Sequence, residues 1–186
     1  MAEAARRLTP ALRRAVRHAL AEGDVIACPT EAVWGLGCDP FREDALQRLL
    51  ALKRRAPAKG LIVVATGIEQ LGALVQLPPK DTLARALATW PGPATWVFPA
   101  GPAASPTLTG GRDTLAVRVS AHPVVRALCE AWGGPLVSTS ANRSGRAPAR
   151  SRTEVQIRFP EVLAVPGALG GLDKPTPIRD VMTGHY

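Results

Sequence analysis

The spacing of apolar residues along the chain predicts several helices. A leucine or valine recurs at every fourth position from Leu8 to Leu20, which is the spacing of one helical face. This stripe predicts a helix over residues 8–22, ended by Gly23. A second stripe predicts a helix over 43–55. The same criterion predicts further helices over residues 68–75, 82–90, 123–132 and 153–159.

Short apolar runs between these helices predict strands. Residues 61–64 are apolar at every position, which is typical of a strand buried on both faces. Residues 114–119 instead alternate, so Thr114, Ala116 and Arg118 share one face and the larger apolar residues share the other. Other strands are predicted over residues 25–28, 95–98, 136–137, 162–165 and 178–181. Helices and strands that alternate, with several short connections, predict an α/β fold with mixed strand directions.

Composition limits the class of protein. At 186 residues we expect a single domain over residues 1–186 with a core of its own. No apolar run is long enough for a transmembrane helix. Arginines among alanines near the N-terminus resemble an organelle transit peptide, but the apolar spacing over 8–22 favours a structural helix. The three cysteines lack metal-ligand spacing and are odd in number, which favours the reducing cytoplasm and predicts no metal site.

The charge and two polar segments point to anionic ligands. The formal charge of +8 favours nucleotides or RNA as partners, although an arginine-rich genome would produce the same composition. The strand at 136–137 is followed by Ser138-Thr139-Ser140-Ala141-Asn142-Arg143-Ser144-Gly145. We expect these residues to form a loop at the carboxyl end of a strand, where α/β sheets bind ligands, and to offer hydroxyl and amide groups to phosphate or carboxylate oxygens.

A cluster of cations supplies the matching charge. Lys53, Arg54, Arg55 and Lys59 crowd together just before a buried strand. Cations that favour a helix C-terminus are the alternative explanation. A lysine and an arginine together suit a polyphosphate, one as a point charge and the other as a bidentate fork. Because standard P-loop and dinucleotide fingerprints are absent, dispersed side chains would have to hold a nucleotide.

Three further features have both a functional and a structural interpretation. Arg118 lies inside an alternating strand and could clamp a carboxylate, or it could be an edge-strand arginine that reaches solvent. Thr30-Glu31 could begin a helix, but the glycines and Trp34 that follow favour a tight turn with an aromatic wall. The stretch 99–112 is long for a connection and is a candidate lid.

Taken together, these segments resemble the threonylcarbamoyl-AMP synthase family, the YrdC-like proteins of tRNA modification, in its short single-domain bacterial form. The resemblance is carried by blocks along nearly the whole chain: Pro29-Thr30-Glu31 with Gly35-Leu36-Gly37, Lys53-x-Arg55, Trp90-Pro91-Gly92-Pro93-Ala94-Thr95, Val117-Arg118-Val119 with His122-Pro123, and Ser138-Thr139-Ser140-Ala141-Asn142-x-Ser144-Gly145. It implies a twisted mixed sheet, flanked by helices, with a basic concave cavity.

The resemblance also implies an activity. The family joins L-threonine, bicarbonate and ATP into threonylcarbamoyl-adenylate, a nucleotidyl transfer that releases pyrophosphate. A tRNA-threonylcarbamoyl transferase machinery then passes the group to an adenosine of tRNA, and a direct tRNA contact of this chain stays open. Carboxylated threonine would attack the α-phosphorus, so catalysis is mainly alignment and charge neutralisation. We expect Mg²⁺ to arrive on the triphosphate with few protein ligands.

Site residues follow from the family's motifs, position by position. Lys53, Arg55, Ser140 and Asn142 match its Lys-x-Arg and Ser-x-Asn tetrad and would act on the ATP phosphates, and Thr114 would add to the nucleotide site. Thr30, Arg118 and Ser138 would hold threonine, with Arg118 on its carboxylate, together with Thr176. The chain departs from the family at three positions: Ala56 replaces a proline, Val64 replaces the histidine of longer members, and Thr176 replaces a serine.

Two other functions compete with this one. In the first, the basic cavity is an RNA-binding module without catalysis, for which charge would matter and Ser140 would not. In the second, the chain has a related carbamoyl-adenylate activity, as in hydrogenase maturation, which is disfavoured because those proteins embed this domain in much longer chains.

Overall fold

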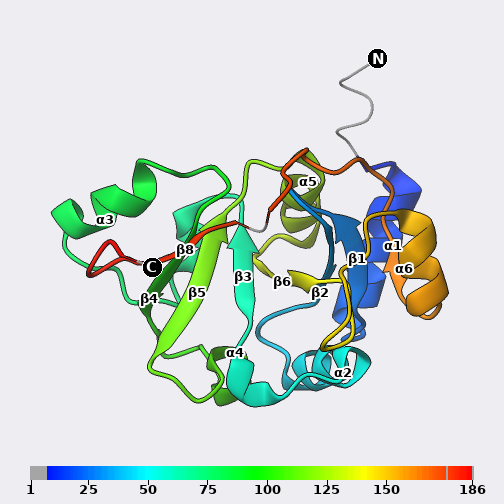
Figure 1. The fold of residues 1–186 in the computed structure, drawn as a ribbon, viewed down its shortest axis with the longest axis horizontal. Coiled ribbons are helices and arrows are strands. Elements are labelled where there is room, and N and C mark those ends of the chain that lie inside the picture. Colours follow the sequence, from blue (N-terminus) through cyan, green and yellow to red (C-terminus); the bar gives the residue numbers. More distant parts are fainter. Residues whose placement is uncertain (1–7, 175, 186) are drawn as a thin grey trace.

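A computed structural model describes residues 8–174 and 176–185 and shows a mixed sheet with helices on both sides (Figure 1). The sheet has eight strands in the order β7-β1-β2-β6-β3-β5-β4-β8 among the described residues. The strands are β1 (Ile26–Pro29), β2 (Trp34–Gly37), β3 (Ile62–Ala65), β4 (Thr95–Pro99), β5 (Thr114–Val119), β6 (Leu136–Ser140), β7 (Leu163–Ala164) and β8 (Ile178–Asp180). β3 runs parallel to β5 and antiparallel to β6, which confirms the predicted α/β fold with mixed strand directions.

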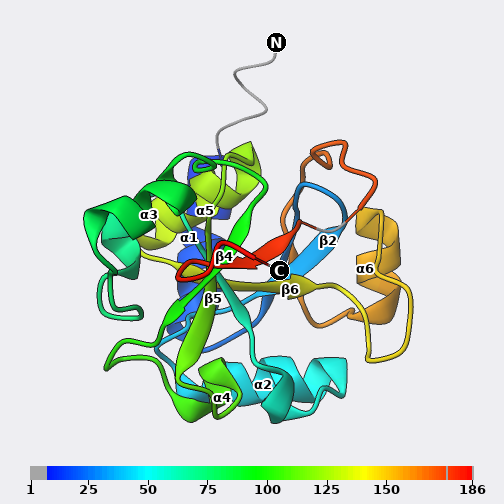
Figure 2. The ribbon, with the colours of Figure 1, turned by 60° about the vertical axis from the view of Figure 1, so that its left-hand side comes forward.

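The helices form two groups that cover different sides of the sheet (Figure 2). On one side α1 (Pro10–Ala21) packs against α5 (Pro123–Trp132) over a cluster that includes Val64 and Leu136. On the other side lie α2 (Glu43–Lys53) and the short α4 (Pro106–Thr109). The remaining helical segments are α3 (Lys80–Leu87), α6 (Arg152–Arg158) and two 3-10 turns at Pro57–Lys59 and Ile68–Leu71.

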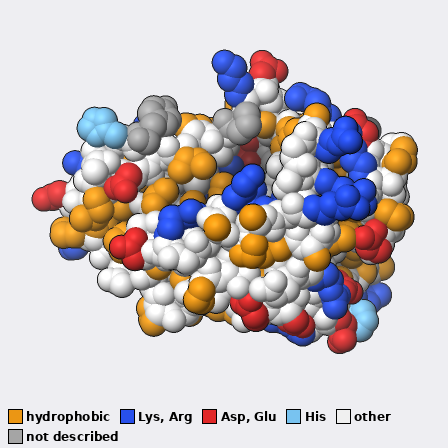
Figure 3. All heavy atoms as spheres, turned by 60° about the horizontal axis from the view of Figure 1, so that its bottom comes forward, with side chains coloured by type: hydrophobic (Ala, Val, Ile, Leu, Met, Phe, Trp, Pro, Cys, Tyr) orange, Lys and Arg blue, Asp and Glu red, His pale blue; other side chains and the backbone are white. Residues whose placement is uncertain are grey.

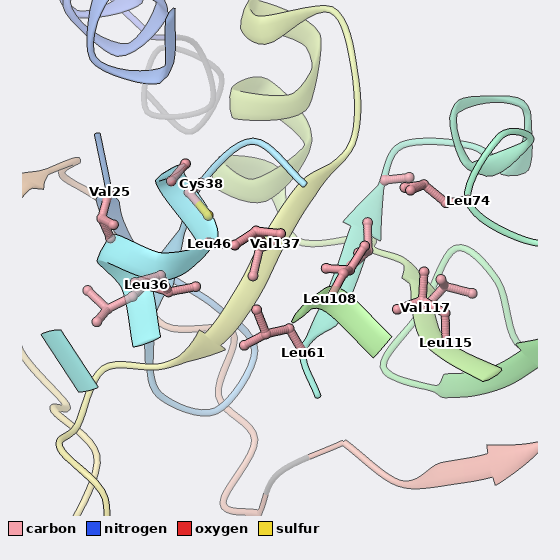
Figure 4. Packing of buried hydrophobic residues seen from close by; sticks show 14 of the residues in the cluster. Val25, Leu36, Cys38, Leu46, Leu61, Leu74, Leu108, Leu115, Val117 and Val137 are labelled. Carbon is pink, nitrogen blue, oxygen red and sulfur yellow. The ribbon is translucent and has the colours of Figure 1, made fainter. Parts of the chain in front are cut away.

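The larger core lies between the sheet and α2. Figure 4 shows Leu46 of α2 beside Val137 of β6, with Leu61 and Leu108 nearby. Val63 belongs to this cluster, whereas its neighbour Val64 belongs to the cluster under α1 and α5, because successive strand residues point to opposite faces. Val63 and Val64 are therefore buried on opposite faces, as the apolar run at 61–64 predicts, whereas Ile62 is half-buried.

The α1 and α5 layer covers only part of its sheet face. Val64 and Leu136 lie under the helices, but the next residues on the same face are Ile62 and Ser138, which pair with each other across β3 and β6. Ala116 pairs with Ile62 on the other side. This row lines cavities rather than core. The open half of the face is therefore where side chains can meet a ligand.

Two of the predicted elements differ in the structure. β6 continues to Ser140, so the hydroxyls of Ser138 and Ser140 lie within a strand and not in a loop after it. The last three residues of β6, Ser138, Thr139 and Ser140, line a cavity instead of apolar core, so the end of the strand has the composition of a loop. The helix expected over 68–75 is a 3-10 turn over Ile68–Leu71.

The segment after β1 also differs from the prediction. The tight turn is made by Thr30, whose backbone N–H donates to the Val33 carbonyl at 3.1 Å. Trp34 then begins β2 and is 2% exposed within the core, so it is no cavity wall. At Gly37 a Cβ atom would lie 2.6 Å from the Val137 carbonyl oxygen, so the strands approach too closely there for any other residue.

The candidate lid over 99–112 is packed against the molecule. It contains α4, in which Leu108 is fully buried, and the Leu61 N–H donates to the Leu108 carbonyl at 2.9 Å. Its start is held by the Gly101 N–H, which donates to the Leu74 carbonyl at 2.8 Å. The stretch is therefore anchored at both places, and closure over a ligand stays a prediction.

Candidate functional site

The open half of the sheet face holds a cavity of about 290 Å³, called here the Arg118 cavity. Its polar lining comes from the β1–β2 turn, the segment after α2, β5, β6 and the C-terminal segment: Thr30, Glu31, Arg55, Arg118, Ser138, Thr139, Ser140 and Thr176. Register explains this convergence, because Ser138 pairs with Ile62 of β3, and Ser140 pairs with Gly35 of β2. Strands far apart in the sequence thus bring hydroxyls and guanidiniums to one place.

Arg118 supplies a buried cation to this cavity. Its guanidinium Nη1 donates to the Thr176 hydroxyl at 2.9 Å, and its Nη2 lies 3.2 Å from the Oε2 of Glu31. Only 7% of the Arg118 side chain is exposed. Burial lowers the pKa of Arg118, and the negative charge of Glu31 opposes that shift. The arrangement holds a guanidinium at a fixed position in the wall, as carboxylate recognition requires.

Thr30 and Ser138 complete the rim of this end. The Thr30 hydroxyl donates to the Val33 carbonyl at 2.8 Å, which leaves its oxygen lone pairs as acceptors. Gly35 faces Thr30 so closely that a Cβ at position 35 would lie 3.1 Å from the Thr30 methyl group. These groups can hydrogen-bond the polar atoms of a small ligand.

A second cavity of about 360 Å³, called here the Lys59 cavity, lies along the same face. Three cations line it, Arg55, Lys59 and Arg112, and no acidic residue is among the described residues of its lining. Thr114 lines this cavity and not the Arg118 cavity. Arg55 and Ile62 line both, so the two cavities meet at Arg55. A long anionic ligand could therefore extend from one cavity into the other.

Arg55 is held in place at this junction. Its Nη2 donates to the Gly60 carbonyl at 2.9 Å. Burial lowers the pKa of Arg55, and the nearby charge of Arg112 lowers it further. Two guanidiniums that repel each other raise the local affinity for an anion between them.

Lys53 takes a different position from the one expected of a wall residue. It is 2% exposed, and its ammonium donates to the backbone carbonyls of Ser140 and Asn142. The Asn142 carboxamide oxygen lies 3.4 Å from the Lys53 Nζ and accepts from the Ser140 hydroxyl at 2.5 Å. Burial, followed by the charge of Arg55, lowers the pKa of Lys53 to about 8. Lys53 thus ties the end of β6 to α2, and neither Lys53 nor Asn142 is among the described lining of the cavities.

The sequence-predicted residues therefore fall into three groups. Six of them line the Arg118 cavity: Thr30, Arg55, Arg118, Ser138, Ser140 and Thr176. Thr114 lines the Lys59 cavity, and Lys53 and Asn142 hold the polar turn behind Ser140.

Sequence reasoning missed Glu31, Ser120 and Arg112. Glu31 could have been noticed because no helix pattern follows the Thr30-Glu31 pair, which leaves a carboxylate at the end of a buried strand without an N-cap role. Neither Ser120 nor Arg112 has a local signal.

A mixed α/β sheet with a cation-lined, hydroxyl-rich hollow on its open face defines a class of protein, the binders of small anionic molecules. The chain belongs to the Sua5/YciO/YrdC family, whose sequence model, described as "Telomere recombination", matches residues 18–184. The chain is 56% identical over 176 residues to the threonylcarbamoyl-AMP synthase of Halorhodospira halophila, with 92% of each chain covered. It is 54% identical over 184 residues to that of Xanthomonas campestris, with 95% and 96% covered.

The fold also matches solved structures. The crystal structure of P. abyssi Sua5 complexed with L-threonine has a TM-score of 0.86 and 31% sequence identity. The match covers 94% of this chain and 52% of the Sua5 chain, so this chain spans about half the length of that protein.

Two further properties bear on cofactors and membranes. Among residues 8–174 and 176–185, no group of three or more histidine, cysteine or acidic side chains is arranged to hold a metal ion. No helix within these ranges has the length and apolar character needed to cross a bilayer.

The three cysteines are not paired with one another. Cys28, Cys38 and Cys129 are free cysteines, and burial raises the pKa of Cys28 to about 12.

Proposed function

We propose that this protein is a threonylcarbamoyl-AMP synthase, which condenses L-threonine, bicarbonate and ATP into threonylcarbamoyl-adenylate and pyrophosphate. The observation that carries the proposal is the pair of cavities that meet at Arg55, one with a buried guanidinium and hydroxyls and one lined by cations. The relatives named threonylcarbamoyl-AMP synthase match over nearly their whole length, which supports the same reaction.

The Arg118 cavity is the proposed site for threonine. Its carboxylate would bind the Arg118 guanidinium, and the hydroxyls of Thr30, Ser138 and Thr176 would hydrogen-bond the rest of the amino acid. The complex of P. abyssi Sua5 with L-threonine supports this ligand for the fold. Bicarbonate would carboxylate the threonine nitrogen here, with loss of water and one proton, to give a carbamate.

ATP would enter from the Lys59 cavity, with Thr114 beside the nucleotide and the α-phosphate at the junction. Arg55 lines both cavities at this junction, Ser140 lies in the wall of the Arg118 cavity, and Lys53 and Asn142 keep Ser140 in place. A carbamate oxygen attacks the α-phosphorus, a new P–O bond forms, and the bond to the β-phosphate oxygen breaks to release pyrophosphate. The cations neutralise the charge that builds up on the leaving group.

Magnesium would be bound mainly by the phosphates. The only carboxylate in the described lining of the two cavities is Glu31, which is paired with Arg118, so the protein offers no cluster of oxygen ligands of its own. We assign the whole chain to one domain that works in the cytoplasm and passes its product to a tRNA-threonylcarbamoyl transferase machinery.

A direct tRNA contact would use the basic surface beside α6. Figure 3 shows basic side chains gathered on the side of the molecule where α6 lies. Arg143, Arg146, Arg150 and Arg152 are exposed there. We expect the double variant Arg143→Glu/Arg146→Glu to weaken tRNA binding and flatten its salt dependence, measured by filter binding. The α1 variant Arg13→Glu/Arg17→Glu makes the same charge change elsewhere and serves as the control; equal losses in both would exclude this surface.

The decisive experiment for the proposed function is the Ser140→Ala variant. We expect it to lose threonine-dependent pyrophosphate release while it keeps its affinity for RNA. Ser144→Ala removes an exposed hydroxyl from the turn that follows and should keep full activity. Unchanged turnover in Ser140→Ala would refute the proposed enzymatic function. Tight, salt-sensitive RNA binding without turnover in the native protein would favour the RNA-binding module, and turnover that needs no threonine would favour a carbamoyl-adenylate activity.

A further inference from the structure

A buried acid stands in the wall of the Arg118 cavity. Only 10% of the Glu31 side chain is exposed, and its Oε2 lies 3.2 Å from the Arg118 Nη2. Glu31 is the only acidic residue in the described lining of that cavity. A buried guanidinium without a counter-charge is unfavourable, so one function of Glu31 is to offset the burial of Arg118.

Neighbouring groups fix both the carboxylate and the backbone of Glu31. Its Oε1 accepts a hydrogen bond of 2.8 Å from the Ser120 hydroxyl, which itself accepts from the His122 backbone N–H at 3.0 Å. The Glu31 carbonyl accepts from the Leu172 N–H at 2.9 Å. At Gly170 a Cβ would lie 2.9 Å from the Glu31 Cα, so the chain over 170–172 packs closely against the Glu31 backbone. The negative charge is thus held where it is and cannot move freely with a ligand.

The ion pair between Arg118 and Glu31 does not use all the hydrogen-bonding groups of its two members. A pair that served only to cancel charge could align two N–H groups of the arginine on two carboxylate oxygens. Here Nη1 is directed to Thr176, and the Nε of Arg118 and the Oε2 of Glu31 are buried without a hydrogen-bond partner. Each member therefore keeps unused hydrogen-bonding capacity just behind the cavity wall, at a cost in stability that charge cancellation alone does not explain, and its charge acts on a ligand through space.

We propose that Glu31 is a specificity-determining residue that makes the Arg118 cavity select a zwitterion. With Arg118 it presents a positive and a negative charge side by side, which matches an α-amino acid with its carboxylate towards Arg118 and its ammonium group towards Glu31. A 2-hydroxy acid of the same shape would bring only a negative charge, and Glu31 would repel it. The pair thus admits threonine and discriminates against carboxylates without an amino group. This inference rests on the proposed function and concerns the same site.

The test compares two ligands on two proteins. Isothermal titration measures the affinities for L-threonine and for 2,3-dihydroxybutanoate, in which a hydroxyl replaces the amine, on the native chain and on Glu31→Gln. Glutamine keeps the size of the side chain and an oxygen for Ser120 but removes the charge. We expect the preference for threonine over the hydroxy acid to fall about tenfold or more, chiefly through weaker threonine binding. Glu130→Gln, an exposed acid on α5, should leave the preference unchanged.

The ratio of affinities separates selection from mere stability, because a general weakening of the fold would reduce both affinities alike. An unchanged ratio, or a tighter threonine complex in Glu31→Gln, would overturn the inference. If Glu31→Gln fails to bind ATP and so has not folded, Ser120→Ala frees the carboxylate without removing it and should reduce the same ratio by a smaller factor; no reduction there would also overturn it. If the native chain binds no threonine at all, the proposed function fails instead.

Discussion

The two cavities of the open sheet face differ in how they hold charge. In the Arg118 cavity the Arg118 guanidinium is buried, paired with Glu31 and bonded to a hydroxyl, so its charge is offset and, within the described lining, only Arg55 at the junction adds an unpaired cation. In the Lys59 cavity Lys59 and Arg112 are exposed, and no acid is among the described lining residues. The difference shows how one sheet can serve two ligands: the paired end suits a zwitterion of fixed shape, and the cationic end suits a polyanion of variable pose.

Burial also decides how the two ends respond to the solvent. Charges exposed to water are screened by salt over about 10 Å at 0.1 M, whereas a buried pair is screened much less. We therefore expect ionic strength to weaken the nucleotide end and to leave the amino-acid end nearly unchanged.

The largest effect is expected where the cavities meet. Arg55→Ala removes the guanidinium that lines both of them and should reduce kcat on the order of 100-fold, because it removes charge stabilisation at the reacting phosphate. Single-turnover pyrophosphate release at saturating substrates measures this. Arg54→Asn is the matched control, since Arg54 is exposed, lines neither cavity and has a φ of 49° that asparagine tolerates. A loss confined to KM would mean that Arg55 only binds substrate.

The Arg118→Ala variant tests whether the two cavities bind their ligands independently. Arg118→Ala leaves Glu31 buried and unpaired and should weaken threonine binding on the order of 100-fold. The affinity for ATP should change less than about threefold, because the Lys59 cavity keeps all its cations. Titration with each ligand measures both. An equal loss for ATP would mean that the two cavities are one site in energetic terms.

The pH dependence tests Lys53. The pKa of Lys53 is lowered to about 8 from an ordinary value of 10.5, so the folded protein loses this proton before the unfolded chain does. Between these values the unfolded chain holds more protons, and the contribution of Lys53 to stability rises with pH. We expect kcat/KM for ATP to fall about tenfold per pH unit above 8, because the charge of Lys53 is lost, while stability rises.

Thermal melts and initial rates over this pH range check both trends, and Lys53→Met should abolish each of them. Stability that falls between pH 8 and 10 in the native chain, but not in Lys53→Met, would contradict the lowered pKa of the buried ammonium group.

The smallest effect is expected from the exposed cations. Lys59→Ala should raise KM for ATP a few-fold at low salt and hardly at all at high salt, because the charge is screened. Lys80→Ala removes an exposed lysine of α3 that lines neither cavity, and it should leave KM for ATP unchanged at either salt concentration. A salt-independent effect of Lys59→Ala would indicate a direct, desolvated contact instead.

Much of the fold was predictable because the spacing of apolar residues within a segment indicates whether it is a helix or a strand. The predicted helix at 123–132 and the strand at 114–119 agree with α5 and β5 at both ends, since Pro123 starts the one and strict alternation marks the other. Elements with a mixed signal were missed or misplaced. β2 contains two glycines that local rules assign to a turn, and the cavity-facing hydroxyls of β6 read as a loop.

Within the candidate site, the sequence by itself determined which residue types are present and that Thr114 and Arg118 share one face of a strand. Only the tertiary structure decided that Ser138 pairs with Ile62, that Lys53 turns inward to Ser140, and that Glu31 opposes Arg118. The physical reason is that periodicity reports the burial of one segment at a time. Register between distant strands, and the place where helices leave a sheet face open, depend on how all segments pack together.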